Sequence, residues 1–242
     1  MKNILLIFIL GISITGFSQQ ITVNYERRAN IENQIKNLKN EEEKQFAINM
    51  LSEPVPFTLI VKDGKSLYYS KPIINKTKNE IKINGKEIKT LNVGKTDGGL
   101  YKNYETKEYL KENDLLGKKF LIKDSLRKIE WQLSSEQKKI GDYKVFKAMA
   151  VVDDEQITAW YTEDIPIPDG PDNYYGLPGL ILEVENEALS FHALTISFEP
   201  IQIEIKKPNK GKEITLAEYL KIRDEKIEEL KSGNGNVLKF GG

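Results

Sequence analysis

The chain has 242 residues, of which 36 are Lys or Arg and 36 are Asp or Glu, so its formal net charge is zero. This balance gives no electrostatic reason to expect a nucleic-acid partner, and no basic block argues for an anionic membrane surface. The sequence contains no Cys and one His, which excludes disulfides and Cys-His catalysis and leaves a zinc site without its usual ligands. We therefore expect no metal and no cofactor.

The first 18 residues have the order of a secretory signal peptide: a basic residue, then an apolar run, then small residues. Lys2 precedes an uncharged run over residues 4–17, and the small residues Gly16 and Ser18 lie at its end. The run is shorter than the roughly 20 apolar residues of a membrane-spanning helix. We expect cleavage near Ser18 and an exported protein that is periplasmic or associated with the outer membrane.

The mature chain is expected to begin with a strand and a helix. Ile21–Arg27 alternates apolar and polar residues, which is the pattern of a half-buried strand. Apolar residues then recur at helical spacing over residues 30–52, which predicts a single amphipathic helix. Pro54 and Pro56 disfavour helix in the residues before them, so we expect the helix to end there.

From Phe57 to Phe198 the pattern is almost entirely that of β-strands. Asp63-Gly64 and Asn84-Gly85 each lie between two such strands and accept the positive φ angles of tight hairpin turns. Strands joined by short turns form an antiparallel sheet, and many short strands at fairly even spacing are typical of a curved sheet or partial barrel. The other expected strands are Tyr101–Thr106, Lys118–Ile122, Glu130–Leu133, Tyr143–Val152, Gln156–Thr162, Leu180–Glu185 and Ser190–Phe198, with a hairpin at Asp153-Asp154-Glu155.

A second helix is predicted near the C-terminus. Thr215 and Glu218 have the spacing of a capping box, in which each side chain satisfies a free backbone N–H, and apolar residues follow at helical spacing. The predicted fold class is therefore α+β: a curved, mainly antiparallel β-sheet or partial barrel with an N-terminal and a C-terminal helix. We expect one β-rich domain, residues 19–232, and a flexible tail, residues 233–242.

A Pro-Gly pair interrupts the apolar run before the strand Leu180–Glu185. The four residues 177–180, Leu-Pro-Gly-Leu, fit a type II turn, in which Pro178 fixes φ at the second position and Gly179 takes a positive φ at the third. Apolar residues then alternate in the strand, as expected for a strand that is buried on one face. This geometric interpretation accounts for the stretch without a ligand.

The hexapeptide Gly-Leu-Pro-Gly-Leu-Ile, residues 176–181, resembles the signature of the GLPGLI family of exported Bacteroidetes proteins of unknown function. The upstream stretches Ile140–Ala148 and Ile157–Pro171 resemble that family as well. The resemblance covers the half of the mature chain from about Trp131 onward. It implies export and a strand-rich fold, but it implies no reaction. Many members have a cysteine in the segment that corresponds to residues 143–147, and this chain has none.

A weaker likeness, at the level of the fold, is to periplasmic lipoprotein-carrier domains. A Trp-Tyr strand, an Ile-Pro exit and a Gly-Leu-Pro sequence before the next strand look like the last strands of those domains. The domains are curved antiparallel sheets whose concave face, partly covered by helices, holds acyl chains. The likeness implies a concave face for this protein and, by itself, no function.

The polar candidates for a functional site are weak. His192 is the one histidine, within a predicted strand, and a lone histidine there is more often a surface or core residue than a base. Asp169–Asn173 could resemble a calcium loop, but the twelfth position counted from Asp169 is Leu180 instead of Glu, so a turn cluster is favoured. Among 36 acidic residues a pair of catalytic carboxylates can always be drawn, so that pattern carries no information.

Aromatic residues give the stronger candidate site. They lie on or beside most predicted strands, and in a curved sheet some of them line the concave side. An ordinary core is the simpler interpretation, but an apolar cleft with hydroxyls at its rim is also typical of a small-molecule or lipid site. The Pro-rich loop from Ile165 to Gly179 is long, and long loops are often functional. The candidate ligand-binding residues are Trp131, Trp160, Tyr161, Tyr174, Tyr175, Leu177 and Pro178.

Three functions follow as hypotheses. The first is a non-enzymatic envelope protein that binds an apolar ligand or an extended peptide on a concave β-sheet. The second is a structural or interaction subunit that docks onto an outer-membrane protein partner through the loop or a sheet edge, because edge strands offer main-chain pairing. The third, and the weakest, is a hydrolase that uses carboxylates alone.

Overall fold

The computed structural model describes residues 20–36, 38–70, 80–83, 86–92, 99–200, 204–232 and 238–240, with the backbone alone for residues 80–83, 86–92, 230–232 and 238–240. The elements in chain order are β1 (Ile21–Ala29), α1 (Ile31–Ile35), α2 (Glu41–Leu51), β2 (Val55–Lys62), β3 (Lys65–Tyr69), β4 (Glu80–Ile83), β5 (Lys86–Asn92), β6 (Leu100–Asn103), β7 (Glu108–Leu115), β8 (Lys118–Ser125), β9 (Gln132–Ile140), β10 (Tyr143–Val152), β11 (Glu155–Thr162), β12 (Leu180–Glu185), β13 (Leu189–Ser197), β14 (Lys212–Ile214), α3 (Leu216–Ser232) and β15 (Leu238–Phe240).

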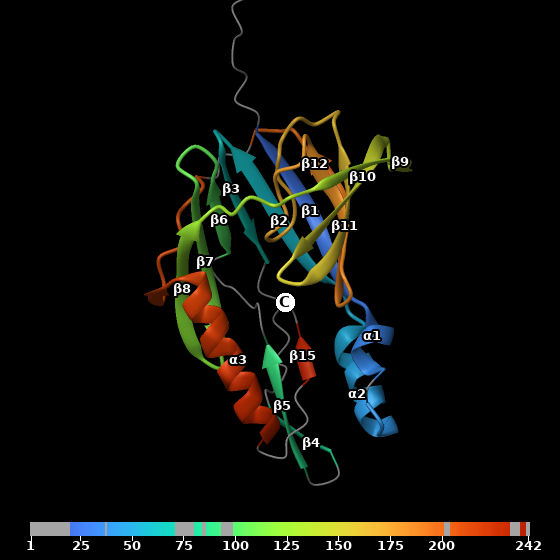
Figure 1. Ribbon diagram of the computed structural model, residues 1–242, viewed down its shortest axis with the longest axis vertical. Helices are drawn as coiled ribbons and strands as arrows, with labels where there is room; N and C mark the ends of the chain where they lie inside the picture. Colours follow the sequence, from blue (N-terminus) through green and yellow to red (C-terminus); the bar gives the residue numbers. More distant parts are fainter. Residues whose placement is uncertain are drawn as a thin grey trace, which may run out of the picture.

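Twelve strands form one open sheet in the order β14-β8-β7-β6-β3-β2-β1-β13-β12-β11-β10-β9. Neighbouring strands are antiparallel except β14, which pairs with β8 in parallel. The sheet curls, and below it α3 lies on one side and α1 with α2 on the other, with the small sheet β15-β5-β4 between them (Figure 1). The predicted α+β class with a mainly antiparallel, open sheet is confirmed.

Short-range turn chemistry explains the hairpins. Asp63 and Gly64 join β2 to β3 with φ angles of 52° and 68°, and Asp153 and Asp154 join β10 to β11 with φ angles of 49° and 66°. Two consecutive positive φ angles are the geometry of the hairpin turn that matches strand twist, so both predicted hairpins are confirmed. Asn84-Gly85 lies outside the described residues, although β4 and β5 do pair antiparallel.

The single helix predicted over residues 30–52 is wrong, because the segment forms two helices. The Asn40 side chain accepts hydrogen bonds from the backbone N–H groups of Glu42 (2.8 Å) and Glu43 (3.3 Å). Asn at this position caps a new helix, and three acidic residues in the first turn of α2 suit the positive end of its dipole. The apolar spacing correctly predicted helix in this segment, but the prediction did not include the cap at Asn40 that begins the second helix.

Strands β7 and β14 were not predicted, and β9 is longer than the predicted Glu130–Leu133. In β7 the charged and polar residues Glu112 and Asn113 are only 8% and 6% exposed, which breaks the usual alternation of a half-buried strand. The Glu112 carboxylate accepts hydrogen bonds from the backbone N–H groups of Asn209 and Lys210, each at 2.9 Å. Burial of the acid is therefore compensated by a segment nearly 100 residues away.

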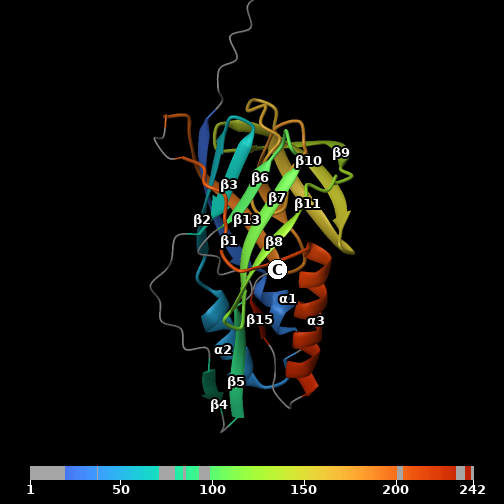
Figure 2. The same cartoon turned by 90° about the vertical axis from the view of Figure 1, so that its left-hand side faces the viewer.

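That segment covers the outside of the sheet. Figure 2 shows the chain after β13 running over the outer side of β6, β7 and β8. There Ile205 packs against Tyr101, Leu110 and Leu121, which form a separate small core. The sheet is thus covered on both faces at this end, which explains why β6 is buried at all four of its residues.

Helix α3 begins as predicted. The Thr215 backbone N–H donates to Glu218 Oε2 at 2.8 Å, and the Glu218 N–H donates to Thr215 Oγ1 at 3.2 Å, so the capping box is confirmed. The helix packs Tyr219 edge-to-face on Phe120 of β8, with ring centroids 5.9 Å apart. Within the described ranges, no helix has the length and apolar character needed to cross a membrane.

Candidate functional site

The segment between β11 and β12, residues 163–179, lies against the inner face of the sheet. We call inner the face that carries Val23, Leu59 and Tyr68, which lie opposite one another on three neighbouring strands. Ile165 and Ile167 of the segment are 3% and 5% exposed and belong to the same core as those residues. The segment therefore fills part of the concave side with the chain's own side chains.

Lys102 of β6 binds this segment from the sheet through an ion pair and hydrogen bonds. Its Nζ lies 2.5 Å from Asp169 Oδ1, and both side chains are 0% exposed. The same ammonium donates to the backbone oxygens of Asp172 (3.2 Å) and Gly170 (3.4 Å), so each of its three N–H groups has an acceptor. A buried charge is tolerated when it is paired and hydrogen-bonded in this way.

Tyrosines surround the buried pair. The Tyr25 hydroxyl donates to the backbone oxygen of Ile181 at 2.6 Å, and the Tyr104 ring packs edge-to-face on Tyr175. Burial raises the pKa of the Tyr25 and Tyr104 hydroxyls well above the ordinary value, and the negative charge of Asp169 raises it further. Both hydroxyls are therefore neutral at physiological pH, and that of Tyr25 is a hydrogen-bond donor.

A second set of contacts lies nearer the surface. Lys111 Nζ lies 2.9 Å from Asp172 Oδ1, and the Tyr109 hydroxyl donates to Asn173 Oδ1 at 3.0 Å. The acidic cluster of residues 169–173 is thus a turn that is tied to β6 and β7 by ion pairs. In the part of the chain that the structure describes, no group of three or more His, Asp or Glu residues could hold a metal ion.

The Gly-Leu-Pro-Gly-Leu-Ile hexapeptide packs the end of the segment onto the sheet. Gly176 has a φ of +89°, whereas Gly179 does not have a positive φ, so the predicted type II turn is wrong. A Cβ built on Gly179 would lie 1.9 Å from the backbone oxygen of Thr162. The second glycine is therefore required for the close approach of two backbones and not for a left-handed conformation.

The sequence-predicted site residues divide into groups. Tyr161 and Leu177 belong to one buried cluster on the inner face, and Trp131 and Tyr174 pack against it. Trp131 Nε1 donates to the Tyr175 backbone oxygen at 2.9 Å, which ties the connector between β8 and β9 to the segment. Tyr175 itself is 9% exposed. The structure thus brings five of the seven residues together, as packing partners of one another.

Trp160 and Pro178 lie apart from this cluster. Pro178 is exposed. By its register Trp160 lies on the outer side of β11, opposite Lys147 of β10 and Glu183 of β12, and it also packs against the main core that contains Val145. Lys138 Nζ lies 4.3 Å from the centroid of the Trp160 ring, within the range of a cation–π contact.

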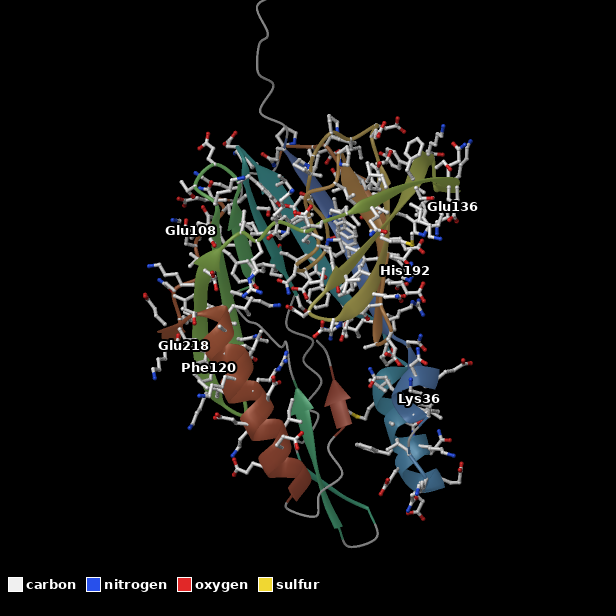
Figure 3. All side chains as sticks on the ribbon, viewed as in Figure 1. Lys36, Glu108, Phe120, Glu136, His192 and Glu218 are labelled. Atoms are coloured by element: carbon white, nitrogen blue, oxygen red, sulfur yellow. The ribbon has the colours of Figure 1, made fainter. Side chains whose placement is uncertain are left out.

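A row of polar residues crosses the outer face beside Trp160. Glu183 stands opposite His192 of β13, which in turn stands opposite Glu26 of β1. Figure 3 shows His192 and Glu136 on one side of the molecule, and Glu108, Phe120 and Glu218 on the other. The outer face of β9 to β13 is therefore distinct from the surface near α3, and beside its polar row it carries the exposed apolar side chains of Met149 and Val151.

His192 has the neighbours of a catalytic triad but not its geometry. Its Nε2 lies 3.0 Å from Ser190 Oγ, and its Nδ1 lies 4.0 Å from Glu183 Oε2. The same Glu183 oxygen accepts from Lys138 Nζ at 2.8 Å. An orienting carboxylate must hydrogen-bond to the imidazole, and here Glu183 is held by Lys138 instead. The backbone of β13 is paired on both sides, with β1 and β12, so it provides no evident oxyanion hole at Ser190.

Strand β9 is the last strand at one end of the twelve-stranded sheet. Among the described residues no strand pairs with its other side, and six of its nine side chains are exposed. Residues 137–140 pair regularly with β10, while between Gln137 and Leu133 three residues of β9 stand against one residue of β10. The outward side of residues 137–140 is therefore a short stretch of unpaired strand edge.

No sequence pattern pointed to Lys102, Asp169 or Lys138 as residues that organise the site. A charged residue inside an otherwise buried strand, such as Lys102 in Leu100–Asn103, is a signal that it has a partner elsewhere. Which acid pairs with it cannot be chosen from 36 candidates by sequence alone.

Comparison with known proteins agrees with the fold and adds no activity. Residues 149–183 match a family model described as "Protein of unknown function (Porph_ging)", which confirms the resemblance to the GLPGLI family over these residues. No curated protein matches the chain. Two solved structures of PNGF-II, in the P21 and C2 space groups, are similar in fold, with TM-scores of 0.54 and 0.51 at 18% identity over 86% of this chain. The chain spans about a third of the length of those structures, 34% and 33%.

Proposed function

We propose that this is an exported, non-enzymatic binding protein that accepts an extended segment of a partner protein as an additional strand at β9. The observation that carries the proposal is the unpaired edge of β9, which has nine residues, whereas β14 at the other end of the sheet has three. An exposed edge presents a row of free N–H and C=O groups, and an extended peptide satisfies them by main-chain pairing.

The packing of the inner face favours the edge of β9, and not the concave side of the sheet, as the binding surface. Tyr161 and Leu177 belong to one buried cluster there, and the buried pair of Lys102 and Asp169 holds the segment in place. An apolar ligand on the concave face would have to displace this segment and break a fully buried ion pair, which costs about 3–5 kcal/mol when one partner is lost. An edge needs no such rearrangement.

Export enters the proposal through the N-terminal pattern of residues 1–18. Envelope fractionation with N-terminal sequencing of the mature protein tests this part. A mature protein that begins near Gln19 and is released with the periplasm, or that sediments with the outer membrane, supports it. Retention of the leader in a cytoplasmic protein contradicts it.

Binding at the edge is tested with extended peptides of alternating Val and polar residues. We expect hydrogen exchange of the outward-pointing β9 amides of Gln137 and Lys139 to slow on binding, because a new strand accepts hydrogen bonds from them. The matched control is the same peptide with alternate backbone nitrogens methylated along its pairing edge, which keeps every side chain and removes the donors. Binding of both peptides with equal affinity would contradict strand addition.

Two further measurements separate the alternatives. In a two-residue hairpin Ile140 and Tyr143 form the closing pair, so the N–H of Gln137 points away from β10. Gln137→Pro should leave the thermal midpoint nearly unchanged and weaken peptide binding at least tenfold. Titration with a fluorescent fatty acid tests the concave face instead, since tight binding of the lipid with loss of protection in residues 163–179 would favour an apolar ligand.

A further inference from the structure

Two lysines stand directly opposite each other at the end of the β9–β10 hairpin. Lys139 of β9 is the register partner of Lys144 of β10, and both side chains are exposed. Like charges at directly opposite positions on an antiparallel pair are destabilising. The arrangement therefore lowers the stability of the hairpin unless another group compensates it.

The neighbouring lysines have acidic partners, and these two do not. Lys138 pairs with Glu183 at 2.8 Å, and Lys147 pairs with Glu136 at 3.0 Å. Over the described residues no ion pair includes Lys139 or Lys144, and the adjacent acid of the turn, Asp142, pairs with neither. Lys144 Nζ lies over the Phe146 ring, 4.9 Å from its centroid. The Lys144 side chain is nevertheless exposed, so its charge can interact with an anion from solvent.

We propose that the partner segment accepted at β9 is acidic and that Lys139 and Lys144 recognise it. The inference rests on the proposed function, because the carboxylates must be carried on a strand that pairs with β9. Such a strand would lie about 4.8 Å beyond β9 and place alternate side chains on the same face as Lys139. Lys144 lies one strand further back, about 10 Å from the new strand, within reach of two long side chains.

The charge pattern favours a peptide over an anionic membrane surface. A membrane recognises many lysines spread over a broad face, whereas here the two uncompensated lysines share one row that ends at an unpaired edge. On the opposite face of the hairpin, the charges of Lys138 and Lys147 are neutralised by carboxylates of the protein itself. An extended acidic segment is complementary to both features, because its backbone can pair with the free edge and its carboxylates can pair with the two lysines.

The test uses the mature protein and three synthetic peptides that differ at alternate positions only. The acidic peptide is Thr-Glu-Val-Glu-Val-Glu-Thr, and its neutral and basic twins carry Gln or Lys in place of Glu. We expect the acidic peptide to bind at least tenfold more tightly than the neutral twin, the basic twin not to bind, and the preference to fall as salt is raised. The double variant Lys139→Gln, Lys144→Gln should lose the preference for Glu and keep or slightly raise its thermal midpoint, because the repulsion between the two lysines is removed.

A matched control makes the same charge change elsewhere. Lys206→Gln with Lys221→Gln removes two exposed lysines, one near the outer side of β6–β8 and one on α3. We expect this variant to bind the acidic peptide as the unaltered protein does. Equal loss in both double variants would show a general charge effect and overturn the inference.

The outcomes separate the inference from the proposed function. If all three peptides protect the β9 amides equally, strand addition stands and recognition of acid by Lys139 and Lys144 is overturned. If no peptide binds, both fail. If vesicles containing phosphatidylglycerol bind through these lysines while the acidic peptide does not, the partner is a membrane surface and the inference is overturned.

Discussion

Lys102 and Asp169 form an ion pair that is closed to solvent, with Nζ 2.5 Å from Oδ1 and both side chains 0% exposed. The pair joins the middle of the sheet to the segment of residues 163–179, across 67 positions of the sequence. It therefore determines which part of the chain covers the inner face.

Removing one partner of this pair should be strongly destabilising. Lys102→Met leaves the Asp169 carboxylate buried without its cation, and Asp169→Asn leaves the ammonium without its anion; each should lower the free energy of unfolding by about 3–5 kcal/mol. Urea denaturation measures the effect. The double variant Lys102→Met, Asp169→Leu should be less destabilised than either single variant. If the double variant lost as much stability as the two single variants together, the two side chains would not interact specifically, and the prediction would be wrong.

The neighbouring pair of Lys111 and Asp172 provides the control. Its side chains are 13% and 18% exposed, so water can replace part of the lost interaction. Lys111→Met should cost about 1 kcal/mol, clearly less than Lys102→Met.

Gly179→Ala should be more damaging than its small change in volume suggests. The added methyl group would lie 1.9 Å from the Thr162 backbone oxygen, and neither strand end can move without disturbing the sheet. We expect the free energy of unfolding to fall by about 3 kcal/mol, or the variant not to accumulate as folded protein. Gly176→Ala meets nothing within 4 Å but has a φ of +89°, so its loss should be about 1 kcal/mol. Thermal unfolding of the two variants, side by side, tests the order.

The stability of the protein should fall at alkaline pH. Burial raises the pKa of Tyr25, Tyr68, Tyr104 and Tyr109 in the folded state. An unfolded tyrosine ionises near a pH of about 10. Above that pH the unfolded state binds fewer protons than the folded state, so the free energy of unfolding decreases as the pH rises toward the folded pKa values.

Urea denaturation at several pH values from about 8 to about 11, a range that includes the ordinary tyrosine pKa, tests this expectation. The slope should become shallower in Tyr25→Phe, by up to about 1.4 kcal/mol per pH unit for each tyrosine removed. An unchanged slope in this variant would show that Tyr25 does not contribute.

The capping box of α3 gives a local prediction. Thr215→Ala removes the oxygen that accepts from the Glu218 N–H and should cost about 1 kcal/mol. Thr215→Ser keeps that oxygen and should be nearly neutral. Because α3 packs Tyr219 against Phe120, the loss should appear in the global unfolding transition. Fraying of the helix without a change in that transition would show that its first turn is not coupled to the sheet.

Short-range chemistry decided much of the fold. Asp63-Gly64 and Asp153-Asp154 adopt positive φ angles where the hairpins require them, and Thr215 with Glu218 begins α3. Features of this kind depend on residues a few positions apart, so their spacing in the sequence is sufficient to predict them.

Only the tertiary structure decided the site. Lys102 meets Asp169, and Glu112 meets Asn209, because strands distant in sequence come together. Which of the adjacent aromatics Trp160 and Tyr161 joins the buried cluster of Leu177 depends on how β11 is placed between β10 and β12. The sequence by itself determined the strand-rich character and the hairpin turns, since these follow from composition and neighbouring residues. Which side chains are buried, which glycine touches backbone and which edge remains unpaired depend on long-range packing, and that is determined only when the whole sheet is assembled.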